Sequence, residues 1–241
     1  MIDETRTSFA RGYRIMRGLI RRERIDVIHS HRYKENILGW LSARGTGGVE
    51  LVSTQHGMPE ALSGRRQVKN FLLSTLNELI LSRYFDVLVA VSHEMRDKLV
   101  TCLEFPEERI TVIKNGIETG ACLQRQSDNP DVVIGSAGRP LPVKDYPLMV
   151  KIAKKLSSAI SEVRFELAGE GPERTTLEHL IDALEIGKIF RLKGEISDMD
   201  CFYRGIHVYL NTSRHEGLPM SILEAMASGL PVAAPSVGGF L

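Results

Sequence analysis

The chain alternates between two hydrophobic patterns, a short apolar run that ends in polar residues and a longer stretch with apolar residues at helical spacing. Short apolar runs are typical of buried strands, and the longer stretches are typical of amphipathic helices. Ser92 stands before one such stretch and is a good N-cap for it. In the first half the pattern predicts strands over 26–31, 51–57, 86–91 and 110–113, and helices over 7–24, 34–43, 66–84 and after Ser92.

The same alternation restarts at residue 132, after a polar stretch at 118–130 that shows no periodicity and is the best linker candidate. A turn is expected at Asn115-Gly116. Strands that alternate with helices predict parallel sheets built from βαβ units. The expected class is α/β, with an N-terminal domain over 1–122 and a C-terminal domain over 131–241 that face each other across a cleft. The second domain should contain strands at 132–137, 163–168, 189–192, 206–210 and 231–234, and helices at 146–160, 172–184, 198–203 and from about Pro219.

Composition narrows the class of protein. A formal net charge of +1 argues against nucleic-acid binding by bulk charge. The three cysteines are scattered without CxxC spacing, which argues against a zinc site and fits a reduced cytoplasmic compartment. No apolar run reaches the roughly 18 residues of a membrane-spanning helix. We therefore expect a soluble cytoplasmic protein, or one peripheral to the cytoplasmic membrane.

The first predicted helix is the feature that raises the membrane question, because apolar residues recur along one face and arginines occupy the other. A basic amphipathic helix can lie on an anionic membrane surface. The simpler interpretation, a solvated charged face, is the one that the pattern alone favours. The arginines are Arg11, Arg14, Arg17, Arg21, Arg22 and Arg24.

Two carboxylates flank the start of the last predicted helix. Glu216 lies before Pro219 and Glu224 lies about one turn inside the helix, which Gly229 should end. Free N–H groups at a helix start favour a phosphate, and carboxylates accept hydrogen bonds from hydroxyls. The pair therefore suits a polyhydroxylated anion, although a surface helix that happens to carry two glutamates has the same spacing.

Cations follow the first strand of the second half. Arg139 comes after Gly138, and Lys144 stands five residues beyond the arginine. Arginine offers a fork of donors and lysine a mobile point charge, so the two make a plausible diphosphate clamp. Two solvated loop cations are the alternative. The segment Gly169-Glu170-Gly171-Pro172 is a further strand-to-helix turn and is weak evidence alone.

Histidines stand at the ends of two strands in the first half. His56 is followed by Gly57 and is therefore approachable, so it can act as a base or hydrogen-bond a sugar hydroxyl. His29 and His31 flank a similar strand end. A strand-end histidine is more often structural, and on this basis His56 is the stronger functional candidate.

Together these residues resemble the retaining GT-B glycosyltransferases, specifically glycosyltransferase family 4, also called glycosyl transferases group 1. The matching pieces occur in the family's order and cover most of the chain, and Glu216 with Glu224 matches the family's E-x7-E motif. The pieces are Asp26–His31, Thr54–Gly57, Val89–Ser92, Val112–Ile117, Gly138-Arg139 with Lys144, Gly169–Pro172, and Glu216 with Glu224.

The resemblance implies two Rossmann-like domains and a UDP-, GDP- or ADP-sugar donor bound to the C-terminal one. It implies that Arg139 and Lys144 neutralise the leaving diphosphate without a metal or other cofactor. Glu216 would hold donor-sugar hydroxyls, Glu224 the ribose, and His56 would lie on the acceptor side. The acceptor would be a saccharide or lipid-linked molecule of polysaccharide, lipopolysaccharide or glycolipid synthesis. The remaining donor-binding positions that it implies are Gly138, Gly171, Leu192, Gly217, Leu218 and Met220.

Departures from the family pattern keep alternatives open. Family members usually begin with a further strand and a glycine-rich loop and continue beyond Gly239, so this chain resembles a glycosyltransferase trimmed at both ends. Asp145 stands where many members have Gly, and Glu118 where many have Asp. An inactive fragment that keeps part of the nucleotide site is one alternative. Another GT-B enzyme, such as a sugar-nucleotide epimerase, is a second, and the E-x7-E spacing with the two cations argues against it.

Overall fold

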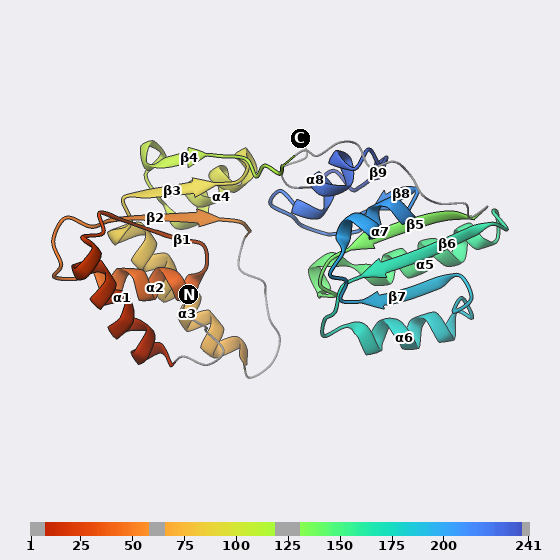
Figure 1. Ribbon diagram of the computed structural model, residues 1–241, viewed down its shortest axis with the longest axis horizontal. Coiled ribbons are helices and arrows are strands. Elements are labelled where there is room, and N and C mark those ends of the chain that lie inside the picture. Colours follow the sequence, from red (N-terminus) through yellow and green to blue (C-terminus); the bar gives the residue numbers. More distant parts are fainter. Residues whose placement is uncertain (1–7, 58–65, 119–130, 238–241) are drawn as a thin grey trace. The chain divides into compact units, whose positions relative to one another are not determined.

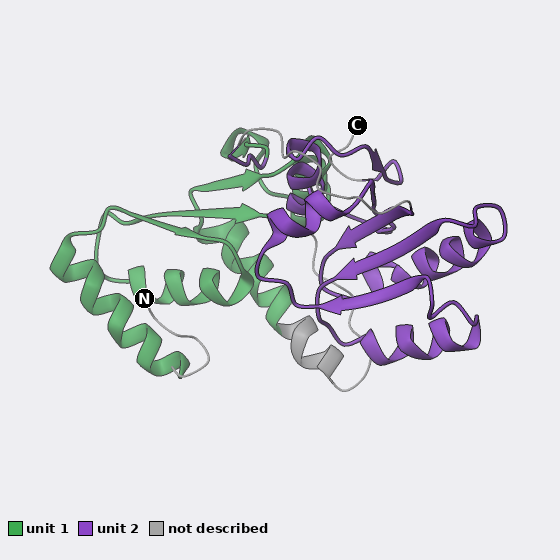
Figure 2. Cartoon of the chain, turned by 45° about the vertical axis from the view of Figure 1, so that its right-hand side comes forward, with its two compact units in different colours: residues 1–114 green, residues 115–241 purple. Residues whose placement is uncertain are grey.

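The computed structural model describes residues 8–57, 66–118 and 131–237, and the chain forms two compact units, residues 1–114 and 115–241 (Figures 1 and 2). The units therefore divide just before the predicted linker, which lies outside the described residues except for Glu118. Each unit contains its own parallel sheet. The predicted α/β class is confirmed.

Unit 1 contains a four-stranded sheet in the order β1-β2-β3-β4, with parallel pairing at each step. Helices connect the strands in sequence, so each crossover is a βαβ unit, as predicted. The strands are β1 (Val27–Ser30), β2 (Glu50–Gln55), β3 (Val87–Ala90) and β4 (Ile110–Val112). The helices are α1 (Phe9–Glu23), α2 (Tyr33–Ala43), α3 (Arg66–Tyr84), α4 (His93–Leu103) and the 3-10 turn η1 (Glu107–Arg109).

The core of unit 1 lies between the sheet and α2, α3 and α4, where Phe85 and Leu88 are fully buried. The backbone N–H of Met95 donates to Ser92 Oγ at 3.1 Å, which confirms Ser92 as the N-cap of α4. Gly12 lies in α1 facing Leu38 of α2, and a β carbon there would make only ordinary contact at 3.6 Å. Glycine is therefore tolerated in α1 because packing against α2 supports the helix.

A buried polar network joins the ends of β1 and β2 to two helices. Asn36 Oδ1 accepts from Ser30 Oγ at 2.6 Å and from Ser53 Oγ at 2.9 Å, and Asn36 Nδ2 donates to Asn77 Oδ1 at 2.8 Å. All four side chains are buried. Because buried polar groups are costly unless they are paired, the network fixes how these strand ends sit on α2 and α3.

Unit 2 contains a five-stranded parallel sheet in the order β7-β6-β5-β8-β9 (Figure 1). The strands are β5 (Val132–Ala137), β6 (Val163–Ala168), β7 (Phe190–Gly194), β8 (Val208–Leu210) and β9 (Val232–Ala233). The helices are η2 (Pro142–Lys144), α5 (Tyr146–Ser157), α6 (Arg174–Ala183), α7 (Met199–Gly205) and α8 (Met220–Ala227).

Two apolar cores cover the two faces of this sheet. Ile134 of β5 packs with α5 and α6 on one face, while Val133 packs with α7 and α8 on the other. Neighbouring residues of a strand point to opposite faces, so the continuous apolar run of β5 serves both cores. This explains why β5 reads as an unbroken hydrophobic stretch in the sequence.

Local expectations were wrong at three places. No turn forms at Asn115-Gly116, and the Asn115 side-chain amide instead donates to the Leu218 carbonyl at 2.8 Å. Helix α5 ends at Ser157 rather than 160, because the N–H groups of both Ala159 and Ile160 turn back to the carbonyl of residue 156. Helix α6 begins at residue 174 rather than 172, after a turn through 172 and 173.

Candidate active site

The strand order of unit 2 reverses between β5 and β8. From β5 the chain runs outward through β6 to β7, and it then returns to place β8 on the opposite side of β5. The segments that leave β5 and β8 at their carboxyl ends are therefore neighbours with no crossover helix between them. In doubly wound sheets such a switch point is where ligands bind. Arg139, Lys144 and Glu216 all lie in these two segments.

Glycines bring the segments after β5 and β6 into backbone contact. Gly138 and Gly169 have φ angles of 156° and 127°, and a β carbon on Gly169 would lie 2.1 Å from the Gly138 carbonyl oxygen. The N–H of Gly138 donates to the Ala168 carbonyl at 2.9 Å. A β carbon on Gly171 would likewise lie 2.6 Å from the Pro140 carbonyl oxygen. These glycines are needed because the two backbones touch.

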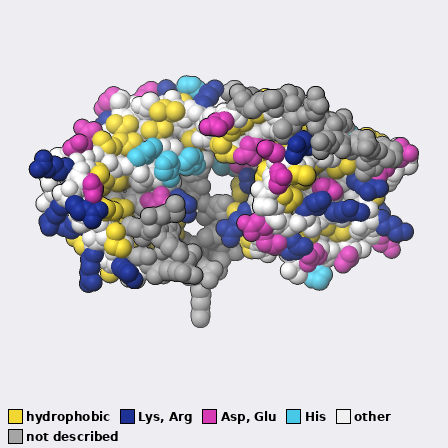
Figure 3. Space-filling model, viewed as in Figure 1, with side chains coloured by type: hydrophobic (Ala, Val, Ile, Leu, Met, Phe, Trp, Pro, Cys, Tyr) yellow, Lys and Arg dark blue, Asp and Glu magenta, His cyan; other side chains and the backbone are white. Residues whose placement is uncertain are grey.

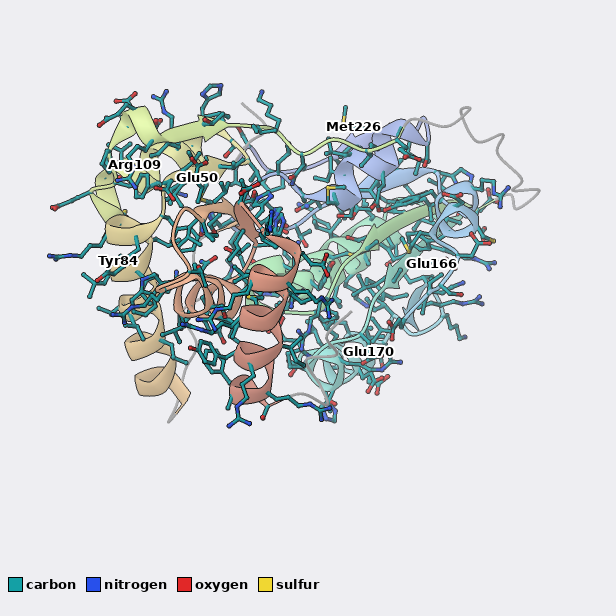
Figure 4. All side chains as sticks on the ribbon, turned by 60° about the vertical axis from the view of Figure 1, so that its left-hand side comes forward. Glu50, Tyr84, Arg109, Glu166, Glu170 and Met226 are labelled. Atoms are coloured by element: carbon teal, nitrogen blue, oxygen red, sulfur yellow. The ribbon has the colours of Figure 1, made fainter. Side chains whose placement is uncertain are left out.

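A pocket of about 440 Å³ opens at this edge of the sheet. Of the sequence-predicted residues, Gly138, Arg139, Met220 and Glu224 line it. Arg139 is exposed, so its guanidinium can reach a ligand. Two further carboxylates, of Glu195 and Glu170 (labelled in Figure 4), line the pocket, and Glu170 pairs with Arg174 at 2.8 Å.

Glu224 is held by a buried tyrosine. The hydroxyl of Tyr203 donates to Glu224 Oε2 at 2.8 Å, and Tyr203 is 3% exposed. Burial first, and then the hydrogen bond to Glu224, raise the pKa of Tyr203 far above its usual range, so the phenol stays a donor. Helix α8 begins at Met220 with Pro219 as its N-cap residue, which places Glu224 inside the helix and Glu216 in the loop before it, as expected.

Tyr203 belongs to a group of three buried tyrosines in unit 2. Tyr209 lies 6.2 Å from Tyr203 between ring centroids, and its hydroxyl donates to the Ala137 carbonyl at 3.0 Å. Burial is the largest cause that raises the pKa of Tyr203, Tyr209 and Tyr146. The three phenols thus support the floor of the site as neutral groups.

Lys144 and Glu216 contact each other. Lys144 Nζ lies 2.5 Å from Glu216 Oε1, and the side chains are 21% and 12% exposed. The hydroxyl of Ser213 donates to the same carboxylate oxygen at 2.6 Å. Neither Lys144 nor Glu216 lines the 440 Å³ pocket, so the structure places this pair beside the pocket that holds Arg139 and Glu224.

Further bonds join the two loops that carry this pair. The hydroxyl of Thr212 donates to the Lys144 carbonyl at 2.9 Å, and Arg214 Nε donates to Asp145 Oδ2 at 2.8 Å. Asp145 adopts a left-handed φ of 46°, a conformation that glycine takes more easily. The bond from Arg214 stabilises the aspartate in it. Burial first, and then Asp145, raise the pKa of nearby Glu173.

The other predicted donor-binding residues lie outside the lining of this pocket. Gly171 follows the turn after β6, and Leu192 lies in β7 with its side chain packed against the core under α5 and α6. Gly217 is buried in the loop before α8, and the Leu218 carbonyl accepts the bond from Asn115.

Histidine side chains gather on one patch of the face shown in Figure 3. In unit 1, His31 Nδ1 lies 3.0 Å from His56 Nε2, and His29 Nε2 lies 2.7 Å from Thr54 Oγ1. The rings of His29 and His31 are 4.5 Å apart between centroids. Strands β1 and β2 are parallel neighbours, so their carboxyl ends bring the three histidines together.

Sequence reasoning missed Tyr203, Ser213 and Arg214. Tyr203 looks like a core aromatic in a short helix, and nothing local marks it as the partner of a carboxylate 21 residues away. Asp145, a departure from the expected glycine, was the one sign that its loop makes an extra contact. In the described part of the chain no group of three or more His, Cys, Asp or Glu side chains is arranged to hold a metal ion. Within the same residues no helix is long and apolar enough to cross a membrane.

Comparison with known families places the two halves of the chain separately. The family described as Glycosyltransferase Family 4 matches residues 3–121, and the family described as Glycosyl transferases group 1 matches residues 124–241. The matches follow one another and together span nearly the whole sequence.

Curated relatives are similar over most of this chain. The phosphatidylinositol N-acetylglucosaminyltransferase GPI3 subunit of Saccharomyces cerevisiae is 27% identical, over 93% of this chain and 51% of its own length. An Escherichia coli UDP-Gal:alpha-D-GlcNAc-diphosphoundecaprenol alpha-1,3-galactosyltransferase is 26% identical, over 92% and 60%. A D-inositol 3-phosphate glycosyltransferase of Thermobispora bispora is 30% identical, over 90% and 56%. The chain spans about half to three fifths of the length of these relatives.

Solved structures share the fold. Anabaena Alr3699/HepE in complex with UDP-glucose superposes with a TM-score of 0.76 at 20% identity, covering 95% of this chain and 64% of that one. Staphylococcus aureus TarM in complex with UDP and acceptor analogues gives 0.72 at 16% identity, covering 93% and 45%. At these identities the likeness establishes the fold.

Proposed function

Since the chain belongs to the glycosyltransferase family 4 and group 1 glycosyltransferases, we propose that it moves a sugar from a nucleoside diphosphate sugar to a saccharide or lipid-linked acceptor, with retention of the anomeric configuration. The observation that carries the proposal is the pocket at the switch point of unit 2, which places Arg139 and Glu224 on one surface. A cation for a diphosphate and a carboxylate for a ribose are the two groups that a nucleotide needs.

The donor is a UDP-, GDP- or ADP-sugar, and the names of the relatives favour UDP. The Escherichia coli relative is named for UDP-Gal, and the Anabaena structure contains UDP-glucose. Glu216 holds the donor sugar, and Lys144 serves both this carboxylate and the diphosphate, since its ammonium has three hydrogens to donate. Arg139 and Lys144 neutralise the diphosphate in place of a metal.

In the reaction the bond between the anomeric carbon and the diphosphate oxygen breaks, and the acceptor hydroxyl oxygen bonds to the same face of the sugar. The hydroxyl proton passes to the departing diphosphate. Positive groups that meet the growing charge on the diphosphate lower the barrier, and loss of one such group typically costs about 10²- to 10³-fold in kcat. Arg139 and Lys144 supply this stabilisation, and His56 acts on the acceptor side.

The test is to titrate UDP, GDP, ADP and their sugars into the 241-residue chain by ligand-observed NMR, with and without EDTA. We expect one nucleotide to bind without metal, and Arg139→Ala to weaken it by about 10-fold or more, the value of a hydrogen bond to a charged group. Lys155→Ala is the matched control, because it removes an exposed cation near the far end of α5. A folded chain that binds none of these nucleotides would contradict the proposal.

Product analysis separates the alternatives. Binding without transfer of sugar to any acceptor would indicate an inactive nucleotide-binding fragment, and conversion of the donor sugar without an acceptor would indicate an epimerase. The anomeric configuration of the product, read by proton NMR, tests retention.

We further propose that α1 rests on an anionic membrane surface, where a lipid-linked acceptor would lie. Ile15 and Leu19 are 37% and 38% exposed, on the same helix as exposed Arg14 and Arg21. An apolar edge beside arginines is the pattern of an interfacial helix. This contact, like a cytoplasmic location, stays a prediction.

The membrane contact is tested by cosedimentation with phosphatidylglycerol vesicles, with phosphatidylcholine vesicles as the comparison. Removing one arginine, by Arg21→Gln, should weaken binding roughly 5-fold, since a basic residue near such a surface contributes about 1 kcal/mol. Arg191→Gln, an exposed site on β7, is the control. Equal binding to both lipids would exclude an electrostatic contact.

A further inference from the structure

Two histidines in unit 1 share one hydrogen-bonding position. His31 Nδ1 and His56 Nε2 are 3.0 Å apart, and the rings are stacked with centroids 5.3 Å apart. Each neutral imidazole carries one N–H and one bare nitrogen. At this distance one of the two facing nitrogens must carry the hydrogen and the other must accept it.

This geometry limits how many protons the pair can bind. One added proton still leaves a donor facing an acceptor, and the bond becomes charge-assisted. A second added proton places two N–H groups head to head and breaks the bond. The pair therefore takes up its protons in two coupled steps, of which the second occurs at lower pH.

The surroundings act in the same direction. Partial burial first, and then the charges of His31 and His29, lower the pKa of His56. Partial burial and His31 lower the pKa of His29. The nearest printed acid, Glu35, accepts from the backbone N–H of His31 at 3.1 Å and lies 3.6 Å from Arg32, so its charge is already engaged.

The strand ends beneath the pair are fixed. Ser30, which precedes His31, belongs to the buried network with Asn36 and Ser53. Thr54, two residues before His56, is 2.7 Å from His29. The two imidazoles thus start from backbone positions that the core of unit 1 holds in place.

We propose that His31 is a positioning residue for His56: the two share one proton, which keeps His56 neutral and leaves only its Nδ1 to meet a substrate hydroxyl. The proposal rests on the proposed function for its catalytic meaning, but the proton sharing itself can be measured without any substrate. A neutral Nδ1 can accept a hydrogen bond from a hydroxyl, and a protonated one cannot.

The first measurement follows the imidazole nitrogens of the full chain by NMR across about pH 5 to 8, where histidines ordinarily titrate. We expect His31 and His56 to titrate together in two steps. In His31→Ala, His56 should titrate in a single step whose midpoint lies above the lower step of the unmodified chain. His179, exposed on α6, is the internal reference and should not change. An unchanged single-step titration of His56 would overturn the proton sharing.

The second measurement is the pH profile of sugar transfer. Loss of His31 should move the acid limb of kcat to higher pH, because His56 then protonates earlier. His31→Ala should also lower the plateau of kcat, roughly 10- to 100-fold if His56 loses its orientation. His31→Asn keeps a hydrogen-bonding side chain that does not titrate, so it should restore the plateau but not the acid limb.

The two measurements fail separately. A coupled titration with an unmoved acid limb would overturn the positioning role. Absence of transfer by the unmodified chain at every pH would overturn the proposed function, and the NMR titration would still decide whether the pair shares a proton.

Discussion

Lys144 Nζ and Glu216 Oε1 are 2.5 Å apart, although 72 residues separate them in sequence. The sequence suggested separate tasks for these residues, a cation for a diphosphate and a carboxylate for a sugar. Their contact shows that the loops after β5 and β8 meet before any ligand binds. Each side chain also holds the other in place, which reduces the conformational entropy that a bound ligand would have to remove.

The Lys144–Glu216 pair should contribute measurable coupling to stability. A double-mutant cycle with Lys144→Met and Glu216→Gln, followed by urea unfolding, should give a coupling energy of about 0.5–3 kcal/mol, the range for residues in direct contact. The exposed pair Lys98–Glu94 on α4, with the same 2.5 Å distance, is the control and should give only about 0.3–0.5 kcal/mol. Equal coupling in the two pairs would show that partial burial adds nothing at the site.

Tyr203→Phe should weaken nucleotide binding through Glu224. The change removes the hydroxyl that donates to Glu224 Oε2, a bond whose net value of about 0.5–1.5 kcal/mol corresponds to roughly 2- to 12-fold in Kd. Calorimetric titration of the nucleotide that binds gives the value. In the Glu224→Gln background the same tyrosine change should have little effect, because its partner is gone. A full effect in both backgrounds would mean that Tyr203 acts by another route.

Gly169→Ala should destabilise unit 2 strongly. Its β carbon would lie 2.1 Å from the Gly138 carbonyl oxygen, and the φ of 127° disfavours any side chain. Backbone strain and overpacking together predict a loss of about 2–5 kcal/mol in the free energy of unfolding. Gly205→Ala, at the end of α7 with nothing within 4 Å of the added carbon, is the control and should change little. A tolerated alanine at 169 would show that the two backbones can separate.

Glu173→Gln should stabilise the fold at neutral pH more than in acid. The folded-state pKa of Glu173 is raised, chiefly by burial, so folding favours its neutral form. Stability from the neutral acid is present below the unfolded pKa and is lost as pH rises through the folded one. Glutamine is always neutral, so its advantage should appear at pH 7 and vanish near pH 4, about the unfolded value. Urea unfolding at both pH values checks this, and an equal effect at both would contradict it.

Much of the fold follows from local pattern. The apolar runs predicted β5 and β6 with the bounds that the structure has, and helix 66–84 matches α3, because burial on a sheet imposes a period that one segment displays alone. The turn at Asn115-Gly116 was wrong because the amide of Asn115 has a distant partner, the Leu218 carbonyl. Such long-range bonds leave no trace in local periodicity.

The candidate site was predictable only in part, for the same reason. Strand-end positions indicated Arg139 and Glu224, and both line the pocket. The pairing of His31 with His56 depends on the register of β1 against β2, which residue spacing does not specify. Tyr203 supports the site from beneath, where an aromatic residue is expected for packing alone.

The burial of three tyrosines under the site gives unit 2 an optical label of its own. All six tyrosines divide evenly, with Tyr13, Tyr33 and Tyr84 in unit 1 and the buried three in unit 2. Because the buried phenols have raised pKa values, they ionise only when their surroundings open, and stability is lost as pH rises above the ordinary phenol range near 10. Phenolate absorbance in alkali therefore reports the opening of unit 2 without an added dye, and a bound nucleotide that stabilises this unit would delay the absorbance change.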